Sequence, residues 1–239
     1  MHSSRYGSEF AGKLWNYLQA VDYRVALSET EKNELFRLRY EAYLAENAIF
    51  PNSSKSLPDV YDEMDNCWNF GIHIGDELAG AIRVHVITPD QPYGPAIDFF
   101  PDIVKPMLDA GNVLVDPTRF VTSREAAINY PEIPYLVLRT ACMAYDAFDA
   151  DYCLASVRNE HRAFYRRVFR AEILCDPRPY PPLTVQLGLM RVNVSSFREQ
   201  LFSRYPVFES SLTERRLLFS RPLDVDSAER QERMLELVS

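Results

Sequence analysis

An aspartate and an arginine, Asp116 and Arg119, stand three residues apart in a stretch that is expected to form a strand. A carboxylate can take a proton from an ammonium group, and an arginine can hold a carboxylate through a two-point fork. The same two residues can also form a structural ion pair at the surface of a sheet. Pro117 lies between them and predicts a bulge or an unpaired edge, because proline has no amide hydrogen to donate.

Other charged residues offer further candidates for chemistry. Glu63 and Asp65 belong to an acidic cluster in a polar loop, although a cluster of this kind is commonly only a solvated surface. Arg37 and Arg39 lie two apart on an expected helix, so at most one of them can face a cleft. Arg83 falls inside an alternating strand, where an unpaired charge is costly. It should therefore pair with the acidic cluster or face a cleft.

A series of arginines recurs every four residues near the middle of the second half of the chain. Its members are Arg158, Arg162, Arg166 and Arg170. A step of four residues advances about 40° past a full helical turn, so on one helix they would form a slowly winding stripe. On a chain with a net charge of -8, such a stripe favours an anionic partner, unless nearby acids such as Glu172 neutralise it.

The elements that must hold these residues are predicted by hydrophobic periodicity and by turn signals. Ser28 and Glu31 form a capping box that opens a helix, and alternating runs around Gly75 predict a hairpin. An apolar strand at residues 152–157 leads into another helix. The order of elements predicts an α/β fold, with a mixed sheet that is antiparallel at its start, parallel in its middle and flanked by helices.

Composition and charge limit the class of protein. A chain of 239 residues with 47% apolar content can bury one sizeable core. The negative net charge argues against nucleic acid as a partner. No run approaches the roughly 18 apolar residues of a membrane span, and the N-terminus lacks the pattern of a signal peptide. Neither the four cysteines nor the four histidines have metal-ligand spacing, so we expect a cytoplasmic protein with reduced thiols and without a metal site.

Residues 151–169 resemble the second half of the GNAT N-acyltransferase fold. Asn159, Ala163 and Tyr165 follow the strand in the order of that family, although the glycine before Phe169 is replaced. The resemblance makes Tyr165 the acid that protonates a leaving thiolate, against a packing role in the core. Ordinary GNATs also hold a pyrophosphate in a glycine-rich loop. Residues 123–130 contain no glycine, which weighs against plain acetyl-CoA as the donor.

Four further motifs resemble one branch of this superfamily, the N-acylhomoserine lactone (autoinducer) synthases and the long-chain N-acyl amino acid synthases. The motifs agree in order and spacing and lie at residues 36–43, 62–65, 80–84 and 116–120. The last one has aspartate for glutamate and threonine for serine. The similarity spans roughly residues 23–194. It favours the amino acid synthases, because residues 46–50 lack the tryptophan that the lactone synthases carry there.

The resemblance implies a set of site residues. The catalytic candidates are Asp116 or Glu63 as the base and Tyr165 as the acid. The candidates for substrate binding are Arg37, Asp65, Arg83, Arg119 and Phe120. The candidates for binding a carrier protein are Arg158, Arg162, Arg166 and Arg170.

The implied activity is transfer of a medium or long acyl chain to the amine of an amino acid. The donor would be the thioester of acyl carrier protein or of CoA, with no permanently bound cofactor, and the amine would attack the thioester directly. One alternative is a synthase of acylated homoserine lactone. Another is a non-catalytic protein of the same fold that binds an acyl carrier or a metabolite. We expect residues 1–22 to form a helical extension, residues 23–220 the acyltransferase domain and residues 221–239 a charged tail or helix.

Overall fold

The computed structural model describes residues 2–220, with side chains from residue 10 onward, so the expected tail at residues 221–239 lies outside the described part. The α-helices are α1 (His2–Leu18), α2 (Glu29–Ala45), α3 (Pro95–Phe99), α4 (Pro101–Asp109), α5 (Arg124–Asn129), α6 (Ile133–Ala147), α7 (Arg162–Phe169), α8 (Arg198–Arg204) and α9 (Leu212–Phe219). The 3-10 helices are η1 (Val60–Glu63), η2 (Asn159–His161) and η3 (Pro206–Phe208). The strands are β1 (Val21–Val25), β2 (Cys67–Ile74), β3 (Glu77–Ile87), β4 (Leu114–Thr122), β5 (Tyr152–Val157), β6 (Glu172–Ile173), β7 (Arg178–Pro179) and β8 (Gln186–Val192).

The strands form one mixed sheet in the order β1-β2-β3-β4-β5-β8-β6, with β7 paired to β8. Neighbouring strands run antiparallel except β4 and β5, which run parallel. The predicted α/β fold, with an antiparallel start and a parallel middle, is confirmed. Within the described residues, no helix is both long enough and apolar enough to cross a membrane.

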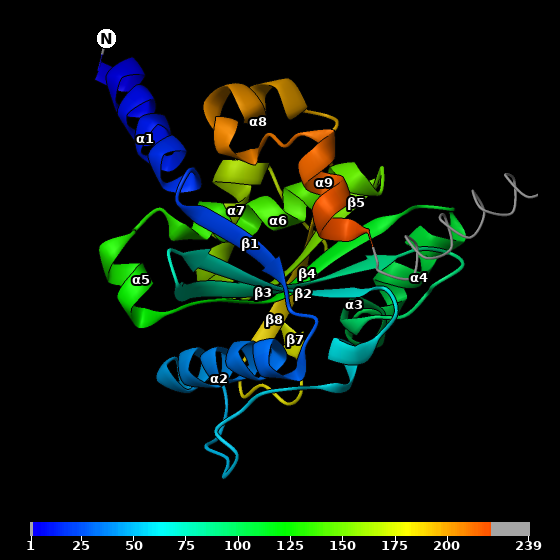
Figure 1. Ribbon diagram of the computed structural model, residues 1–239. Coiled ribbons are helices and arrows are strands. Elements are labelled where there is room, and N and C mark those ends of the chain that lie inside the picture. Colours follow the sequence, from blue (N-terminus) through cyan, green and yellow to red (C-terminus); the bar gives the residue numbers. More distant parts are fainter. Residues whose placement is uncertain (1, 221–239) are drawn as a thin grey trace, which may run out of the picture.

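Helices cover both faces of the sheet (Figure 1). On β3, Ile82 and Val84 point into the main core, which α6 covers. Ala81 points to the other face, where Leu35 and Leu38 of α2 pack against it. Helices α1, α8 and α9 lie on the same side of the sheet as α6, so the described terminal segments cover that face.

Local sequence signals explain two of these elements directly. Ser28 caps α2 by accepting a hydrogen bond from the Glu31 amide, and the Glu31 carboxylate accepts one from the Ser28 amide. The predicted capping box is therefore confirmed. Gly75 adopts φ +62° at the turn between β2 and β3, a conformation that glycine reaches without a steric penalty, and the predicted hairpin is confirmed as well.

Strand β4 carries a bulge just beyond Pro117. Ala81 of β3 pairs with Val121 and Arg83 pairs with Thr118, so a single residue of β3 stands opposite Arg119 and the residue that follows it. Arg119 has φ 53°, which costs a side-chain-bearing residue roughly 1–3 kcal/mol. Because the bulge adds a residue, the consecutive side chains of Thr118 and Arg119 both reach the face that α2 covers. The bulge that Pro117 predicted thus lies two residues later.

Strands β4 and β5 part soon after they meet. Their parallel pairing is limited to Leu114 with Tyr152 and Val115 with Cys153, and β5 continues along its other edge with β8. The backbone groups of β4 and β5 beyond this point have no partner strand between them. This separation makes the space in which the candidate site lies.

The segment that follows residue 197 is anchored to α6 by one buried arginine. The Arg139 guanidinium donates to the carbonyl of Val207 at 2.7 Å and to the carbonyl of Glu209 at 2.8 Å. It also forms an ion pair with Glu214 of α9 at 2.8 Å. Sequence analysis did not single this arginine out, because its partners lie about 70 residues further along the chain.

We expect Arg139→Met to lower the free energy of unfolding by about 2–3 kcal/mol, because the buried carbonyl of Val207 and the part-buried carbonyl of Glu209 lose their donor. Arg216→Met, on the exposed surface of α9, is the matched control and should leave stability within about 0.5 kcal/mol of the original. Urea unfolding followed by circular dichroism measures both changes. Equal stability of the two variants would show that Arg139 is not an anchor.

Candidate active site

A cavity of about 610 Å³ occupies the gap between β4 and β5. Its walls include Tyr43 of α2 on one face of the sheet and Leu138 of α6 on the other. Between them, β4 contributes residues 117–122 and β5 contributes residues 155–157. The cavity therefore passes through the sheet from one face to the other.

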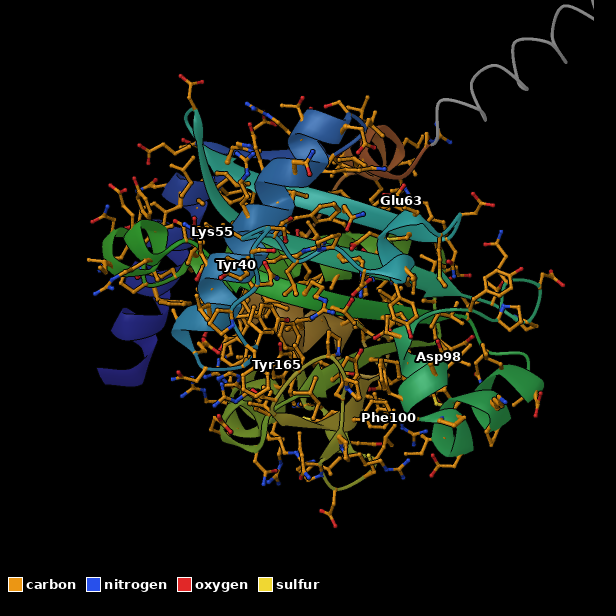
Figure 2. The ribbon with its side chains drawn as sticks, turned by 90° about the horizontal axis from the view of Figure 1, so that it is seen from below. Tyr40, Lys55, Glu63, Asp98, Phe100 and Tyr165 are labelled. Atoms are coloured by element: carbon orange, nitrogen blue, oxygen red, sulfur yellow. The ribbon has the colours of Figure 1, made fainter. Side chains whose placement is uncertain are left out.

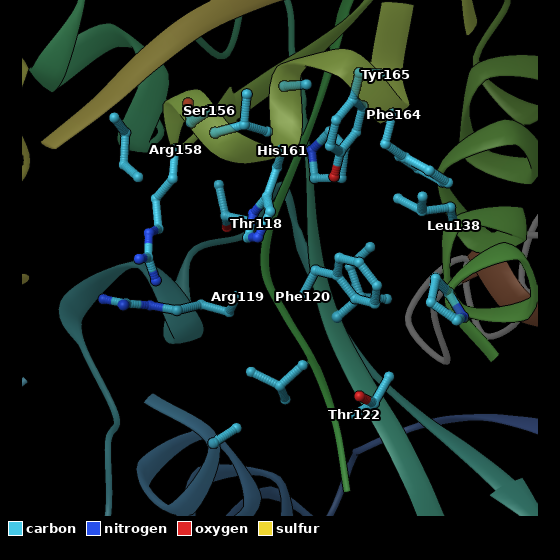
Figure 3. A pocket seen from close by; sticks show the side chains of 18 of the residues that line it. Thr118, Arg119, Phe120, Thr122, Leu138, Ser156, Arg158, His161, Phe164 and Tyr165 are labelled. Carbon is cyan, nitrogen blue, oxygen red and sulfur yellow. The ribbon is translucent and has the colours of Figure 1, made fainter. Parts of the chain in front are cut away.

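The two ends of the cavity differ in polarity. In Figure 3 the side chains of Arg119 and Arg158 extend toward one side, and Phe120, Leu138 and Phe164 lie on the other. One end can thus receive a charged molecule while the other receives an apolar chain.

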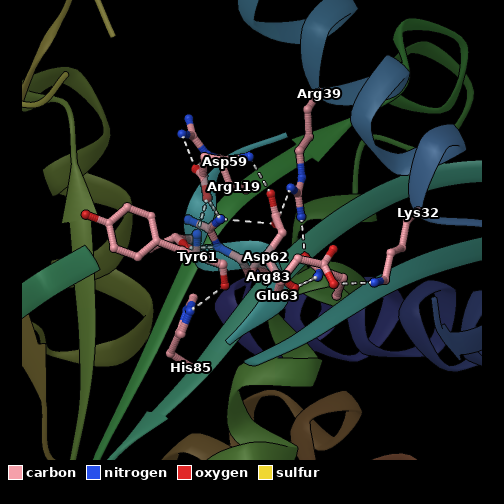
Figure 4. A network of polar contacts seen from close by, with 11 residues as sticks. Lys32, Arg39, Asp59, Tyr61, Asp62, Glu63, Arg83, His85 and Arg119 are labelled. Carbon is pink, nitrogen blue, oxygen red and sulfur yellow. Dashed lines mark hydrogen bonds and ion pairs between the residues drawn. The ribbon is translucent and has the colours of Figure 1, made fainter. Parts of the chain in front are cut away.

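A network of buried ion pairs lies behind the polar end of the cavity (Figure 4). Asp62 binds Arg39 at 2.7 Å and Arg83 at 3.1 Å. Asp59 binds Arg83 and, at 2.6 Å, Arg119. The two carboxylates thereby link three arginines from α2, β3 and β4.

Hydrogen bonds complete this network. Arg39 donates to the side-chain oxygen of Asn69 at 2.6 Å, and Arg83 donates to the Thr118 hydroxyl at 3.0 Å. Both guanidinium groups are almost wholly buried, a condition that a charged group tolerates only when it is paired. The network therefore fixes the position of Arg119, which is the arginine of the network that lines the cavity.

The charges of the network favour an anion at the cavity. Burial alone would raise the pKa of Asp59, but Arg83 and Arg119 lower it to about 2, so this carboxylate stays ionised. Burial lowers the pKa of Arg119, and the charges of Tyr43 and Asp59 more than offset that effect. Three arginines face two aspartates, which leaves one positive charge uncompensated within this group of five. The guanidinium of Arg119 also lies over the ring of Tyr43, 5.5 Å from the ring centroid.

Asp116 lies beside the cavity but does not line it. Its Oδ2 accepts a hydrogen bond of 3.1 Å from the amide of Ala96, at the start of α3. Its Oδ1 is buried and has no hydrogen-bond partner among the described residues. Burial raises the pKa of Asp116 to about 6, against a smaller lowering by Ala96 and Arg83. This is the range in which a carboxylate both accepts and releases protons near neutral pH.

His85 lies opposite Asp116 on β3. Its Nε2 is 3.1 Å from the carbonyl of Tyr61 and its Nδ1 is buried without a partner in the described part of the chain. Burial, together with the charge of Arg83, lowers the pKa of His85 to about 3. The imidazole is therefore neutral at physiological pH and does not supply a charge to the site.

Tyr165 and Ser156 bring hydroxyl groups to the cavity wall. Tyr165 of α7 lines it, and burial raises the pKa of this tyrosine, so the phenol stays protonated. The Ser156 hydroxyl of β5 also lines the cavity and is buried without a hydrogen-bond partner among the described residues. Both groups can donate a hydrogen bond to a bound molecule.

The structure separates several of the residues that the sequence grouped together. Glu63 is exposed and forms an ion pair with Lys32 at 2.6 Å, well away from Tyr165 (Figure 2). Asp65 and Arg37 are exposed as well. Of the two arginines on α2, it is Arg39 that joins the network.

The series of arginines does not lie on one helix. Helix α7 contains Arg162 and Arg166, while Arg158 precedes η2 and Arg170 ends α7 in the left-handed conformation. Arg162 points inward and donates to the carbonyl of Cys175 at 2.7 Å. The predicted continuous stripe is therefore wrong, because η2 and the left-handed residue Arg170 interrupt it. Arg158 lines the cavity, where it pairs with Glu46 at 3.1 Å.

Sequence analysis missed Asp59, Tyr43 and Ser156. Asp59 did carry a signal, because it stands three residues before Asp62 and forms a capping box with it at η1. Tyr43 was part of a recognised motif but resembled a core residue. Nothing in the sequence distinguishes Ser156 from the other residues of its strand.

The fold is that of known acyltransferases. It matches FeeM, an N-acyl amino acid synthase from uncultured soil microbes, with a TM-score of 0.64 and 15% identity over 77% of this chain and 96% of that chain. It matches the acyl-homoserine lactone synthase LasI with a TM-score of 0.55 and 12% identity over 73% and 88%. It also matches an acyl-CoA N-acyltransferase from Pseudomonas aeruginosa, with a TM-score of 0.51 and 16% identity over 72% of this chain and 99% of that chain. No curated protein sequence matches the chain.

These likenesses define a GNAT-like acyltransferase fold. The model of the N-acyl amino acid synthase FeeM family matches residues 34–193, and the chain belongs to that family. The predicted resemblance is confirmed, and the protein is an N-acyltransferase.

Proposed function

We propose that this protein transfers a medium or long acyl chain from a thioester to the amine of an amino acid within the cavity between β4 and β5. The observation that carries this proposal is the cavity itself, which joins a positively charged end to an apolar end across the parting of the two strands. The carboxylate of an amino acid can bind at the positively charged end, and an acyl chain can bind at the apolar end.

The polar end suits the acceptor. Arg119 is held by Asp59 through Nε and Nη2, and it presents the uncompensated charge of the network to the cavity. A carboxylate bound there is recognised by a fixed guanidinium rather than by a flexible ammonium. We assign Arg83 a supporting role, because its donors are engaged with Asp59, Asp62 and Thr118.

The gap between the strands suits the arm of the donor. The unpaired backbone groups of β4 and β5 can bond the amides of an extended phosphopantetheine arm, as added strands are bonded in other proteins. Its thioester then lies near Ser156 and Tyr165, and its acyl chain lies against Phe120 and Leu138.

An acyl carrier protein is the donor that we favour over CoA. The helix after β4, α5, is capped by Ser123, whose hydroxyl accepts from the Ala126 amide at 3.0 Å. An amide used in this way is not free to bind a pyrophosphate, which is the group that CoA has and a carrier-bound arm lacks. Arg158, His161 and Arg167 at the cavity rim can attract the phosphate of the arm and an acidic carrier.

The reaction needs one proton removed before the attack and one delivered after it. We assign the first step to Asp116, whose free Oδ1 takes a proton from the acceptor's ammonium through a water molecule. The neutral amine then attacks the thioester carbon, the C–N bond forms, and the C–S bond breaks. The departing sulfur takes one of the two hydrogens of the attacking nitrogen and the amide keeps the other, while Tyr165 stabilises the sulfur by donating a hydrogen bond. Its raised pKa suits a hydrogen-bond donor better than a full acid.

The test is release of free thiol from long-chain acyl carrier protein and, in parallel, from the same acyl chain on CoA. Each reaction contains a mixture of amino acids, and the products are identified by mass spectrometry. The proposal predicts an N-acyl amino acid, formed faster from the carrier protein. Faster turnover of the CoA thioester would overturn the choice of donor. Thiol release without any acylated amine would overturn the proposed function.

A further inference from the structure

The hydroxyl of Ser156 is a hydrogen-bond donor that the protein itself leaves unused. It lies at the cavity wall, is buried, and has no hydrogen-bond partner among the described residues. A buried hydroxyl without a partner destabilises a folded protein, so its presence needs a physical reason. A bound molecule that accepts a hydrogen bond from Ser156 supplies that reason.

Ser156 faces the polar side of the cavity. Side chains alternate between the two faces along a strand, and the residues on either side of Ser156 in β5 belong to the main core, which α6 covers. Ser156 therefore points to the other face of the sheet, on which the side chain of Arg119 lies. Figure 3 shows Ser156 on the side of Arg158, with Tyr165 nearer the apolar side.

Strand β4 has no backbone donor at the point where the gap opens. The carbonyl of Val113 accepts from the amides of Asp151 and Tyr152 at 2.9 Å and 3.4 Å, so Val113 turns its backbone groups toward β5. This direction alternates along a strand, and the next residues of β4 to face β5 are Val115 and Pro117. Val115 is still paired, but Pro117 has no N–H group. The pairing of the two strands ends there, and β4 presents no amide to the gap at this position.

A thioester in this gap needs a donor at its carbonyl oxygen. When an amine attacks the carbonyl carbon, the C–N bond forms and the π electron pair of the carbonyl moves onto the oxygen, which becomes negatively charged. A donor fixed at this oxygen stabilises the transition state more than the bound thioester. When the intermediate collapses, the electron pair returns to the carbonyl and the C–S bond breaks. The donor keeps its own hydrogen throughout.

We propose that the hydroxyl of Ser156 is the oxyanion donor of the reaction and takes the place of the amide that Pro117 lacks. The inference rests on the proposed function, since it takes the acyl thioester to lie in the gap between β4 and β5. The two hydroxyl groups of the cavity wall then have different roles. Ser156 donates to the carbonyl oxygen, and Tyr165 donates to the departing sulfur.

The test replaces Ser156 by threonine and by valine, two side chains of nearly the same shape of which only threonine has a hydroxyl. Thiol release from long-chain acyl carrier protein gives kcat and the KM of the donor for each variant. Ser156→Val should have a kcat roughly a hundred- to a thousandfold below that of Ser156→Thr, as loss of one oxyanion donor causes. The KM of the donor should be nearly the same in both, because the contact strengthens only in the transition state.

Ser156→Ala removes the hydroxyl without adding volume and should lower kcat by the same factor from that of the original enzyme. The protein loses no internal hydrogen bond in this variant, so it should unfold at the same or a higher denaturant concentration. Ser203→Ala, on the exposed surface of α8, is the matched control and should keep the original rate. An undiminished kcat in Ser156→Ala, or a loss confined to the KM of the donor, would overturn the proposal.

Failure of the proposed function would give a different result, because the original protein would then release no thiol from any donor. Infrared absorption of a bound acyl thioester, isotopically labelled at its carbonyl carbon, reports the hydrogen bond at the carbonyl oxygen without any turnover. The band should lie at a lower frequency on the original protein and on Tyr165→Phe than on Ser156→Ala. The same frequency on the original protein and on Ser156→Ala would overturn the inference.

Discussion

Replacing Asp116 by asparagine is expected to lower kcat/KM by roughly a hundred- to ten-thousand-fold, the range that a positioned general base contributes. The amide keeps the size of the side chain, and its oxygen can still accept the hydrogen bond from Ala96. It cannot take a proton from the acceptor. Steady-state thiol release measures the loss, and Asp102→Asn, on the exposed surface of α4, is the matched control.

The same variant should change the pH profile. Because the pKa of Asp116 is raised to about 6 by burial, the original enzyme should lose kcat/KM as the pH falls through 6 and the carboxylate becomes protonated. Asp116→Asn should lack this acidic limb. Retention of the limb, or of full activity, would show that Asp116 is not the base.

Asp116→Asn should preserve or raise stability, although it lowers activity. The pKa of Asp116 in the folded protein lies above the ordinary value of 3.8, so ionisation favours the unfolded state as the pH rises from about 4 to 6. The amide never ionises and carries no such cost. At neutral pH, Asp116→Asn should therefore unfold at the same or a higher denaturant concentration. A lost activity in this variant would then reflect chemistry rather than misfolding.

Arg39→Met is expected to lower the free energy of unfolding by about 3–5 kcal/mol, the usual cost of leaving one partner of a buried ion pair unpaired. Asp62 would lose its bond of 2.7 Å, and the side chain of Asn69 would lose its donor. Arg37→Met removes the same charge from the same helix but at an exposed position. It should change stability by less than about 0.5 kcal/mol.

Urea unfolding of both variants measures this contrast. Because Asp62 also bonds Arg83, part of the network persists, and the loss in Arg39→Met should be accompanied by a higher KM for the acceptor rather than by complete inactivity. If Arg37→Met were the more damaging change, the orientation of α2 described above would be contradicted.

Local signals allowed much of the fold to be predicted. The capping box at Ser28, the turn at Gly75 and the apolar strand before Arg158 each depend on residues close together in the chain. The place of the bulge could not be fixed in this way. It depends on the register of β4 against β3, and Arg119 rather than Pro117 takes the unusual conformation.

The site was predicted in part. Arg83, Arg119 and Phe120, which the motifs singled out, lie in the network or on the cavity wall, and their role in substrate binding stays a prediction. The choice between Arg37 and Arg39 depends on how α2 is rotated against the sheet, and residues two apart give no sign of it. The ring contacts of Tyr135 with Phe10 and Phe208 join segments about 70 or more residues apart in the chain, and nothing local distinguishes these aromatic residues from any other core residue.

The central claim is that the amine of an amino acid receives the acyl chain in this cavity. The most direct test is tandem mass spectrometry of the product formed from acyl carrier protein and a nitrogen-labelled amino acid mixture. The account predicts a product whose acyl group is joined by an amide bond to the labelled nitrogen, and at most traces of it with Asp116→Asn. An acylated lactone, free fatty acid alone, or undiminished product from the variant would contradict the account.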